Sequence, residues 1–225
     1  MQQDGIVPTP EVGASLVGGL VALVRDVVVR GEIAPGGKLN EHAMAANLGV
    51  SRTALREAVR VLERSNLLVI EPNRGVFVRR ITLKQALDLF DVRAGLARTA
   101  GLLAAVRASE TQLDAMRALH VRMIAAREAG DAAIHYDANT QFHATLMAAT
   151  GNERLMLLEE MMGAELQLFR RRNLGNAGHL DASTTEHGRI LDAMAARDSV
   201  RAARAAERHI LMGKQRMLDT MSPNA

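Results

Sequence analysis

The sequence LGVSRTALREAVRVL, residues 48–62, joins the end of one predicted helix to the start of a second. Gly49 can end the first helix in a left-handed turn, and the Ser51 hydroxyl can cap the free amides of the second. Apolar residues recur every three or four positions in the second helix and predict one buried face. Arginines recur every four positions along another side of it: Arg52, Arg56 and Arg60. The segment therefore predicts two helices joined by a tight turn, the second with a basic outer face.

The flanking sequence completes a small domain around these two helices. A helical apolar stripe runs from Ser15 until Gly31, and Asn40 can cap the short helix that ends at Leu48. Residues 67–80 change to a strand-like period around a Pro-Asn-Arg-Gly turn, which predicts a β-hairpin. We therefore expect a loose tail over 1–14 and a winged helix-turn-helix domain over 15–81.

The rest of the chain has a helical period throughout. Six segments are predicted, at about 83–107, 110–129, 132–149, 153–172, 182–196 and 200–221. They predict an all-α six-helix bundle over 82–222, so the fold class is mainly α with two domains.

Composition excludes several classes of protein. The 225 residues include no cysteine, which removes disulfide scaffolds, thiol nucleophiles, thiolate zinc sites and iron–sulfur clusters. Four phenylalanines, one tyrosine and no tryptophan are too few for a base-stacking platform. The first long apolar stretch, 16–24, is too short to span a membrane, and the first ten residues lack the positive charge of a secretory signal. We therefore expect a cytoplasmic protein without a membrane partner.

Positive charge is concentrated in the predicted helix-turn-helix and hairpin. The net charge is only +3, yet residues 51–80 hold seven arginines against three glutamates, a local excess of 7 − 3 = +4. An arginine fork can pair with guanine or clamp a phosphate, and Thr53 can contact a phosphate or a thymine methyl. Arg74 at the hairpin tip can enter a minor groove, and Gly75 lets the backbone approach the sugar-phosphate wall. The alternative is a solvated helix face whose arginines pair with acids such as Glu63.

Three segments together resemble the winged helix of GntR-family transcription regulators: PGGKLNE (35–41), LGVSRTALREA (48–58) and RGVFV (74–78). The resemblance implies a homodimer on a short palindromic double-stranded DNA operator, with arginines of the second helix and the wing contacting DNA. His42 stands where many members have a DNA-contacting arginine. The candidate DNA-binding residues are His42, Ser51, Arg52, Thr53, Arg56, Arg60, Arg74 and Gly75.

Histidines of three different predicted helices form a candidate metal site. His143, His187 and His209 each lie in a different segment, and Asn139 precedes His143 by one helical turn. An oxygen ligand with three imidazoles suits zinc, nickel or a similar divalent ion, although lone histidines are more often packed or surface residues.

The bundle also resembles the FadR-type (FCD ligand-binding domain) subgroup of that family, in which a Phe-His pattern and two later histidines line a metal-assisted pocket. The resemblance maps the ligands onto Asn139, His143, His187 and His209. A neutral amide at Asn139 is a poorer ligand than a carboxylate, so reduced metal affinity is expected.

The resemblance places Arg93 near the pocket, where its guanidinium can hold the carboxylate of a small organic-acid effector. Family members commonly have glutamate four residues later, where this chain has Ala97. The alternative for Arg93 is a surface salt bridge with Asp88 or Glu110.

The favoured interpretation is a ligand-responsive repressor rather than an enzyme. A metal-dependent hydrolase using the three histidines is the first alternative, but Glu186 is adjacent to His187 and is expected to project elsewhere, which leaves no general base. An architectural DNA binder whose bundle only dimerises is the second alternative. Neither the effector nor the operator is identified by the sequence.

Overall fold

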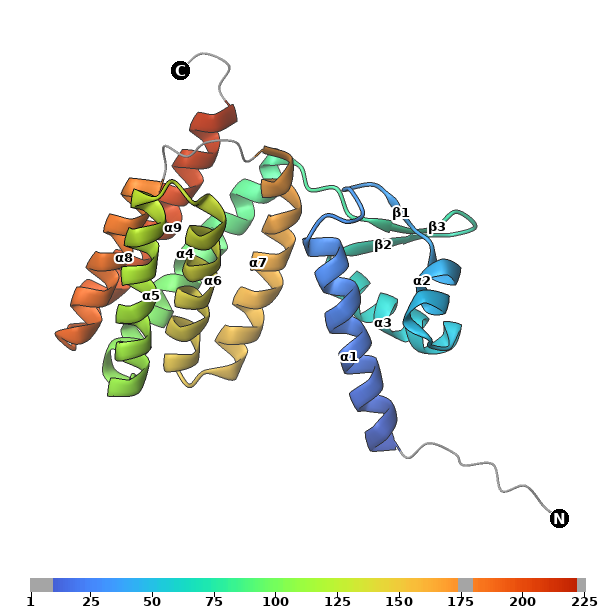
Figure 1. Ribbon diagram of the computed structural model, residues 1–225, viewed down its shortest axis with the longest axis horizontal. Coiled ribbons are helices and arrows are strands. Elements are labelled where there is room, and N and C mark those ends of the chain that lie inside the picture. Colours follow the sequence, from blue (N-terminus) through green and yellow to red (C-terminus); the bar gives the residue numbers. More distant parts are fainter. Residues whose placement is uncertain (1–9, 174–179, 222–225) are drawn as a thin grey trace. The chain divides into compact units, whose positions relative to one another are not determined.

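The computed structural model describes residues 10–173 and 180–221. These residues form nine helices and three short strands in two compact units (Figure 1). One unit comprises the residues up to Thr82 together with Gly163–Arg172, and the other comprises Leu83–Met162 and the residues from Asn173 onward. The predicted mainly α fold, with a small winged domain and a helical domain, is confirmed.

The N-terminal unit contains the predicted helix-turn-helix and hairpin. Its elements are α1 (Pro10–Val29), β1 (Lys38–Leu39), α2 (Glu41–Leu48), α3 (Arg52–Arg64), β2 (Leu68–Glu71) and β3 (Gly75–Val78). The side chain of Asn40 caps α2 by accepting from the Ala43 amide at 3.1 Å, and Ser51 caps α3 by accepting from the Ala54 amide at 3.1 Å. Gly49 ends α2 with a φ of 64°, a conformation that favours glycine. Local sequence thus determines the α2–α3 turn.

Two features of this unit differ from the sequence prediction. Helix α1 begins at Pro10 rather than Ser15, so residues 10–14 of the predicted tail are helical, while 1–9 lie outside the described residues. Proline suits a first helical position because it lacks an amide hydrogen that would be unpaired there. Strand β1 was not predicted from the sequence. It pairs with β3, where Leu39 lies opposite Val76, and completes an antiparallel sheet in the order β1-β3-β2.

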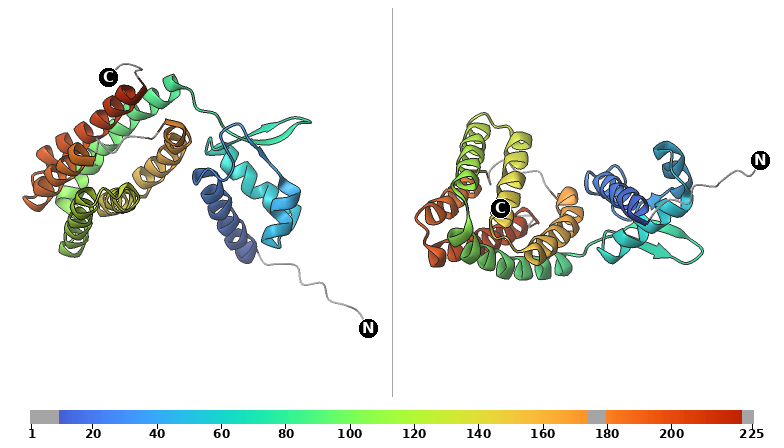
Figure 2. Two further views of the ribbon diagram at one scale, coloured as in Figure 1. Left: turned by 45° about the horizontal axis from the view of Figure 1, so that its top comes forward. Right: turned by 90° about the horizontal axis from the view of Figure 1, so that it is seen from below.

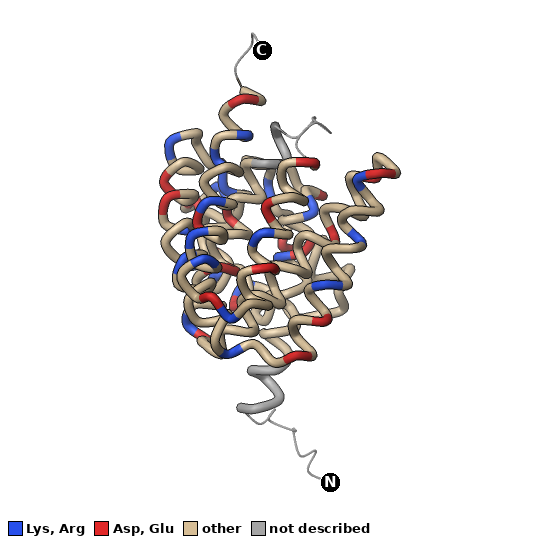
Figure 3. Tube along the Cα trace, turned by 90° about the vertical axis from the view of Figure 1, so that its left-hand side faces the viewer, with Lys and Arg blue, Asp and Glu red and all other residues tan. Residues whose placement is uncertain are grey.

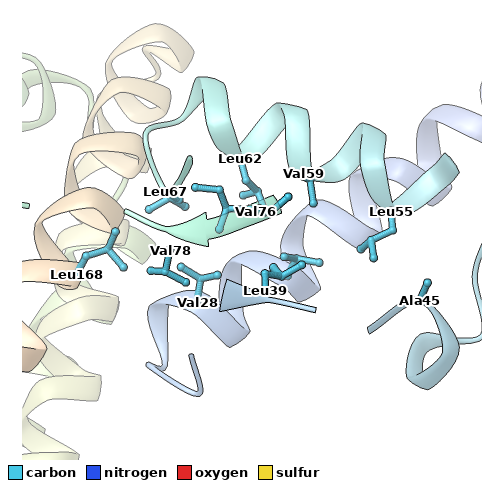
Figure 4. Packing of buried hydrophobic residues seen from close by; sticks show 12 residues of the cluster. Val28, Leu39, Ala45, Leu55, Val59, Leu62, Leu67, Val76, Val78 and Leu168 are labelled. Carbon is cyan, nitrogen blue, oxygen red and sulfur yellow. The ribbon is translucent and has the colours of Figure 1, made fainter. Parts of the chain in front are cut away.

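Aliphatic side chains from every layer of the N-terminal unit form one core (Figure 4). Leu55, Val59 and Leu62 of α3 pack with Val28 of α1 and with the inner face of the sheet, and Leu168 of α7 contributes to the same cluster. Each fully buried aliphatic side chain stabilises the fold by about 1.5–3 kcal/mol. Burial of this side of α3 leaves its opposite side for solvent.

The second unit contains α4 (Leu83–Arg107), α5 (Glu110–Glu128), α6 (Ala132–Ala149), α8 (Leu180–Ala195) and α9 (Ser199–Met221). Helix α7 (Glu153–Asn173) belongs to it up to Met162, and the following residues of α7, Gly163–Arg172, belong to the N-terminal unit. All six predicted segments are present with ends within two residues of the prediction. A capping box of Ser109 and Gln112 begins α5. None of the described helices combines the length and apolar character needed to cross a membrane.

Helices α4 and α9 run side by side through the second unit (Figures 1 and 2). They approach closely at Gly101, where a Cβ atom would lie 2.6 Å from the carbonyl carbon and oxygen of Ala202. A side chain is therefore excluded at this crossing. On the helices that face the viewer in Figure 3, basic and acidic residues are interspersed, as on an ordinary solvated surface.

Candidate functional site

Helix α3 presents its basic side to solvent, as its residue spacing predicts. Arg52, Thr53, Arg56 and Arg60 are exposed, and the Arg56 and Arg60 side chains retain 59% and 62% of their accessible surface. The cap at Ser51 uses that residue's hydroxyl and sets the start of the helix. The guanidinium groups are therefore available to an approaching polyanion.

Glutamates lie beside most of these arginines. Arg56 Nε is 3.5 Å from Glu41 Oε1, and Arg60 Nη1 donates to Glu57 Oε1 at 3.2 Å. Arg52 has no acidic partner among the described residues. The glutamate expected as an arginine partner, Glu63, instead accepts from the Ile70 amide at 3.3 Å. Exposed ion pairs contribute only about 0–1 kcal/mol, so a phosphate can replace the glutamates at low cost.

The hairpin tip adds a second basic group. Arg74 is exposed, pairs with Glu71 and lies 5.6 Å from the centre of the Phe77 ring. Gly75 has a φ of 113°, and a Cβ atom there would lie 2.9 Å from Cε of Lys38. Lys38 thus lies against the wing from β1. The position of Lys38 beside the wing could not be predicted from the sequence, because a two-residue strand has no recognisable alternation.

His42 is the second residue of α2 and is exposed. The structure gives no ion pair for it among the described residues. Its imidazole is therefore available to an external partner, on the helix that precedes α3.

The three predicted metal-ligating histidines come together inside the helical unit. His143 Nε2 lies 3.1 Å from His209 Nε2 and 3.2 Å from His187 Nε2. The ring nitrogens of the three residues all lie within 4.8 Å of one another. His187 and His209 are buried and His143 is half-buried. Residues 44 and 66 positions apart in sequence thus meet at one point.

The other nitrogens of the two buried rings are occupied. His187 Nδ1 lies 2.7 Å from the Ser183 carbonyl oxygen, which can only accept, so this nitrogen carries the hydrogen. His209 Nδ1 lies 2.8 Å from Glu186 Oε2 and is assigned as a donor for the same reason. In their neutral forms both rings therefore direct an Nε2 lone pair toward His143. A cation held by these lone pairs fits this donor set.

Glu186 reaches the histidine site, contrary to the sequence expectation. Besides accepting from His209, its carboxylate accepts from Arg216 Nη1 at 2.7 Å and from Nη2 at 2.9 Å. Neighbouring residues on a helix point about 100° apart. A glutamate side chain is nevertheless long enough to turn back toward a partner on α9. The angle between neighbouring residues therefore does not decide which groups Glu186 can reach.

Burial opposes ionisation of both Glu186 and His187, with different outcomes. Burial acts to raise the pKa of Glu186, but hydrogen bonds from His209 and Arg216 and the charges of both lower that pKa to about 2. Glu186 is therefore ionised at neutral pH. The pKa of His187 is well below 6.5, because burial and the neighbouring His209 and His143 disfavour its charged form. His187 is therefore neutral, as a metal ligand must be.

Asn139, the fourth predicted ligand, lies one turn before His143 on α6 and is half-buried. Residues four apart on a helix leave it on the same side, so the side chains of Asn139 and His143 start from one face of α6. Three imidazoles and one oxygen donor fit a divalent ion such as zinc or nickel.

Arg93 lies in a buried ion pair rather than on the surface. Its Nε donates to Glu159 Oε1 at 3.0 Å, and its Nη2 pairs with the same carboxylate. The surface alternative is therefore wrong: Asp88 pairs with Lys84 and Glu110 with Arg197. Ala97, which stands where family members commonly have glutamate, is buried, and the carboxylate that pairs with Arg93 comes from Glu159 of α7.

Two further histidines form a polar layer that the sequence did not indicate. His120 Nε2 lies 3.0 Å from the Thr184 carbonyl oxygen, and buried His135 Nε2 lies 2.9 Å from Thr184 Oγ1. His135 is two turns before His143 on α6. The spacing of eight residues between His135 and His143 could have indicated that both lie on one face of the helix.

Comparison with known families gives two matches that together span most of the chain. Residues 16–78 match the family described as bacterial regulatory proteins, gntR family, and residues 88–211 match the FCD domain. The two matches coincide with the winged unit and with most of the helical unit.

Several curated proteins are similar over most of their length. A probable D-xylose utilization operon transcriptional repressor of Paenarthrobacter nicotinovorans is 30% identical over 83% of this chain and 84% of its own. The Nta operon transcriptional regulator of Aminobacter aminovorans is 30% identical over 72% of this chain and 79% of its own.

Solved structures share the fold. Escherichia coli McbR/YncC superposes with a TM-score of 0.77 at 19% identity, covering 92% of this chain and 99% of that one. A transcriptional regulator from Rhodococcus sp. RHA1 gives a TM-score of 0.73 at 24% identity, covering 91% and 98%.

Proposed function

The chain belongs to the GntR family of bacterial regulatory proteins and carries an FCD domain, and on this premise we propose a DNA-binding repressor that a small organic acid releases. The relatives are transcription regulators, so the chain is a regulator and not an enzyme. The hydrolase alternative is therefore wrong. The exposed arginine side of α3, fixed by the buried side behind it, is the observation that carries the DNA-binding proposal.

On DNA, we place α3 in the major groove. Arg52 and Arg56 read base edges there, while Thr53, Arg60 and the backbone near Ser51 contact phosphates. Arg74 and Gly75 contact DNA from the wing, and His42 contacts the backbone from α2. A homodimer presents two such surfaces to the half-sites of a palindrome.

In the helical domain, His143, His187 and His209, with Asn139, would hold a divalent ion. The converging Nε2 atoms support this proposal. When bound, such an ion supplies a Lewis-acidic centre that can bind the carboxylate or hydroxyl oxygen of an acid. Arg93 would pair with an effector carboxylate in exchange for Glu159.

The names of similar proteins support repression and a cytoplasmic location. One is named a probable repressor of a D-xylose utilization operon, and another, 25% identical over 84% of this chain, is named the repressor GlaR of Escherichia coli. We therefore favour repression over activation. A bacterial DNA regulator acts where the chromosome lies, so we place this chain in the cytoplasm.

The test of DNA binding begins with selection of an operator from a random-sequence pool. Fluorescence anisotropy then compares the operator with random DNA for the wild type, Arg56→Ala and Arg204→Ala. Arg204 is an exposed arginine of α9 without an ion pair among the described residues, so it controls for loss of charge.

Arg56→Ala is expected to lose about 1–3 kcal/mol of discrimination, because its guanidinium reads a base edge. Arg204→Ala should match the wild type. Operator affinity should also fall steeply with added salt, since phosphate neutralisation releases counterions. Unchanged discrimination in Arg56→Ala would remove that residue from base reading, and salt-independent affinity would contradict DNA binding by this surface.

A further inference from the structure

The Glu186 carboxylate is held in one position by two neighbours. Both oxygens accept from the Arg216 guanidinium, at 2.7 and 2.9 Å, and Oε2 also accepts from His209 Nδ1 at 2.8 Å. The Glu186, Arg216 and His209 side chains are only 10%, 14% and 9% exposed. A two-pronged, buried contact of this kind favours one orientation of the carboxylate.

The contact fixes the His209 ring as well. An ionised carboxylate at Nδ1 requires the ring hydrogen to be there, and Nε2 then carries the lone pair that can bind a metal ion. That Nε2 is the atom 3.1 Å from His143 Nε2 at the centre of the cluster. Carboxylates that orient metal-binding histidines through the second ring nitrogen are a general device of metal sites.

Charge gives a second reason for this arrangement. Among the described residues, the cluster of possible metal ligands consists of three histidines and contains no carboxylate. The ligand atoms of these histidines all lie within 4.8 Å of one another. Position 139 carries a neutral amide, so the proposed ligands offer no negative charge to a divalent cation. Glu186 is a negative group hydrogen-bonded directly to one of those ligands, His209.

We propose that Glu186, held by Arg216, is a positioning residue that keeps His209 in its metal-binding tautomer and supplies the negative charge that the Asn139 amide lacks. The proposal rests on the metal pocket of the proposed function. It adds that affinity for the ion depends on a residue that does not touch it.

The experiment compares zinc affinity in the wild type, Glu186→Gln and Glu207→Gln by competition with a chromophoric chelator. Glu207 is the matched control, because it is a glutamate of α9 in a partly exposed pair with Arg98. Glu186→Gln is expected to bind zinc about 10- to 100-fold more weakly, the usual effect of losing such an orienting partner. Glu207→Gln should bind as the wild type does.

Arg216→Lys keeps the positive charge but loses the two-pronged contact, and it guards against a folding defect in Glu186→Gln. We expect an intermediate loss of affinity. In the zinc-free proteins, long-range proton–nitrogen NMR correlations of the histidine rings should show the Nδ1-protonated tautomer of His209 in the wild type and a mixture in Glu186→Gln.

The outcomes separate the two proposals. Equal zinc affinity in the wild type and Glu186→Gln would overturn the positioning role while leaving the metal pocket intact. A wild type that binds no zinc would remove the metal from the proposed function, and the positioning role with it. Weaker binding with an unchanged His209 tautomer would overturn the orienting role.

Discussion

A neutral imidazole in the protein interior links stability to pH. His187 has a pKa well below 6.5 because burial comes first and its histidine neighbours second in disfavouring the charged form. Burial, with a smaller effect of Arg127, also lowers the pKa of His135. In the unfolded chain both rings regain ordinary pKa values, so they take up protons on unfolding in mild acid.

We predict that the metal-free protein loses stability as the pH falls below 6.5, the ordinary histidine value. The slope approaches about 1.4 kcal/mol per pH unit for each buried neutral histidine. Glu186 does not contribute in this window, because its stabilisation is lost only as the pH falls below 4.5 toward about 2. Urea titrations of chelated protein across this range measure the slope. His187→Gln should flatten it, and an equally steep variant would contradict the assignment.

At the scale of single elements, two glycines of α4 have opposite roles. Gly101 lies where α4 meets the backbone of Ala202, whereas a Cβ atom on exposed Gly95 would meet nothing within 4 Å. Both residues belong to the middle of one helix. The intrinsic preference of a helix for alanine therefore applies to both, and only the neighbour differs.

We predict that Gly101→Ala destabilises the helical domain by about 1–3 kcal/mol, because two backbones must separate. Gly95→Ala should stabilise it by about 0.5–1 kcal/mol. Thermal or urea unfolding followed by circular dichroism measures both changes. If both substitutions stabilise, the close approach of α4 and α9 does not exist as described.

Elements whose ends are set by contacts between residues close in sequence were predictable. Asn40 and Ser51 cap helices by contacts within three residues, and the six later helices follow the helical period. Strand β1 was not predictable, because two residues show no period and their pairing depends on distant β3. The partners of His209 and Arg93 were missed for a related reason. Glu186 and Glu159 lie on other helices, and helical spacing carries no information about reach between helices.

At the scale of the whole molecule, the repressor and architectural interpretations differ in whether the helical domain binds an effector. A sensor binds an effector in its folded helical domain, so metal and acid together raise the melting temperature. A purely dimerising bundle gives neither response. Binding to one domain alters operator affinity only if it favours one conformation over another.

We predict that zinc with a small carboxylic acid at 100 times its Kd stabilises the protein by about 2.7 kcal/mol. The same mixture should weaken operator binding. A melting screen of acids with and without metal, followed by anisotropy on operator DNA, measures both effects. His209→Ala should abolish the metal-dependent part. Absence of any shift with every metal and acid would favour the architectural interpretation.

Glutamates placed beside the arginines of α3 and the wing also affect how the protein searches a chromosome. Glu41, Glu57 and Glu71 must be displaced whenever a phosphate takes an arginine. Each of these exposed pairs is worth only about 0–1 kcal/mol, so any DNA can displace the glutamates, and only aligned base contacts add affinity beyond that exchange. If the chain acts as proposed, random sequence would therefore release it sooner than an operator does, and it would sample many positions before it stops at one that matches.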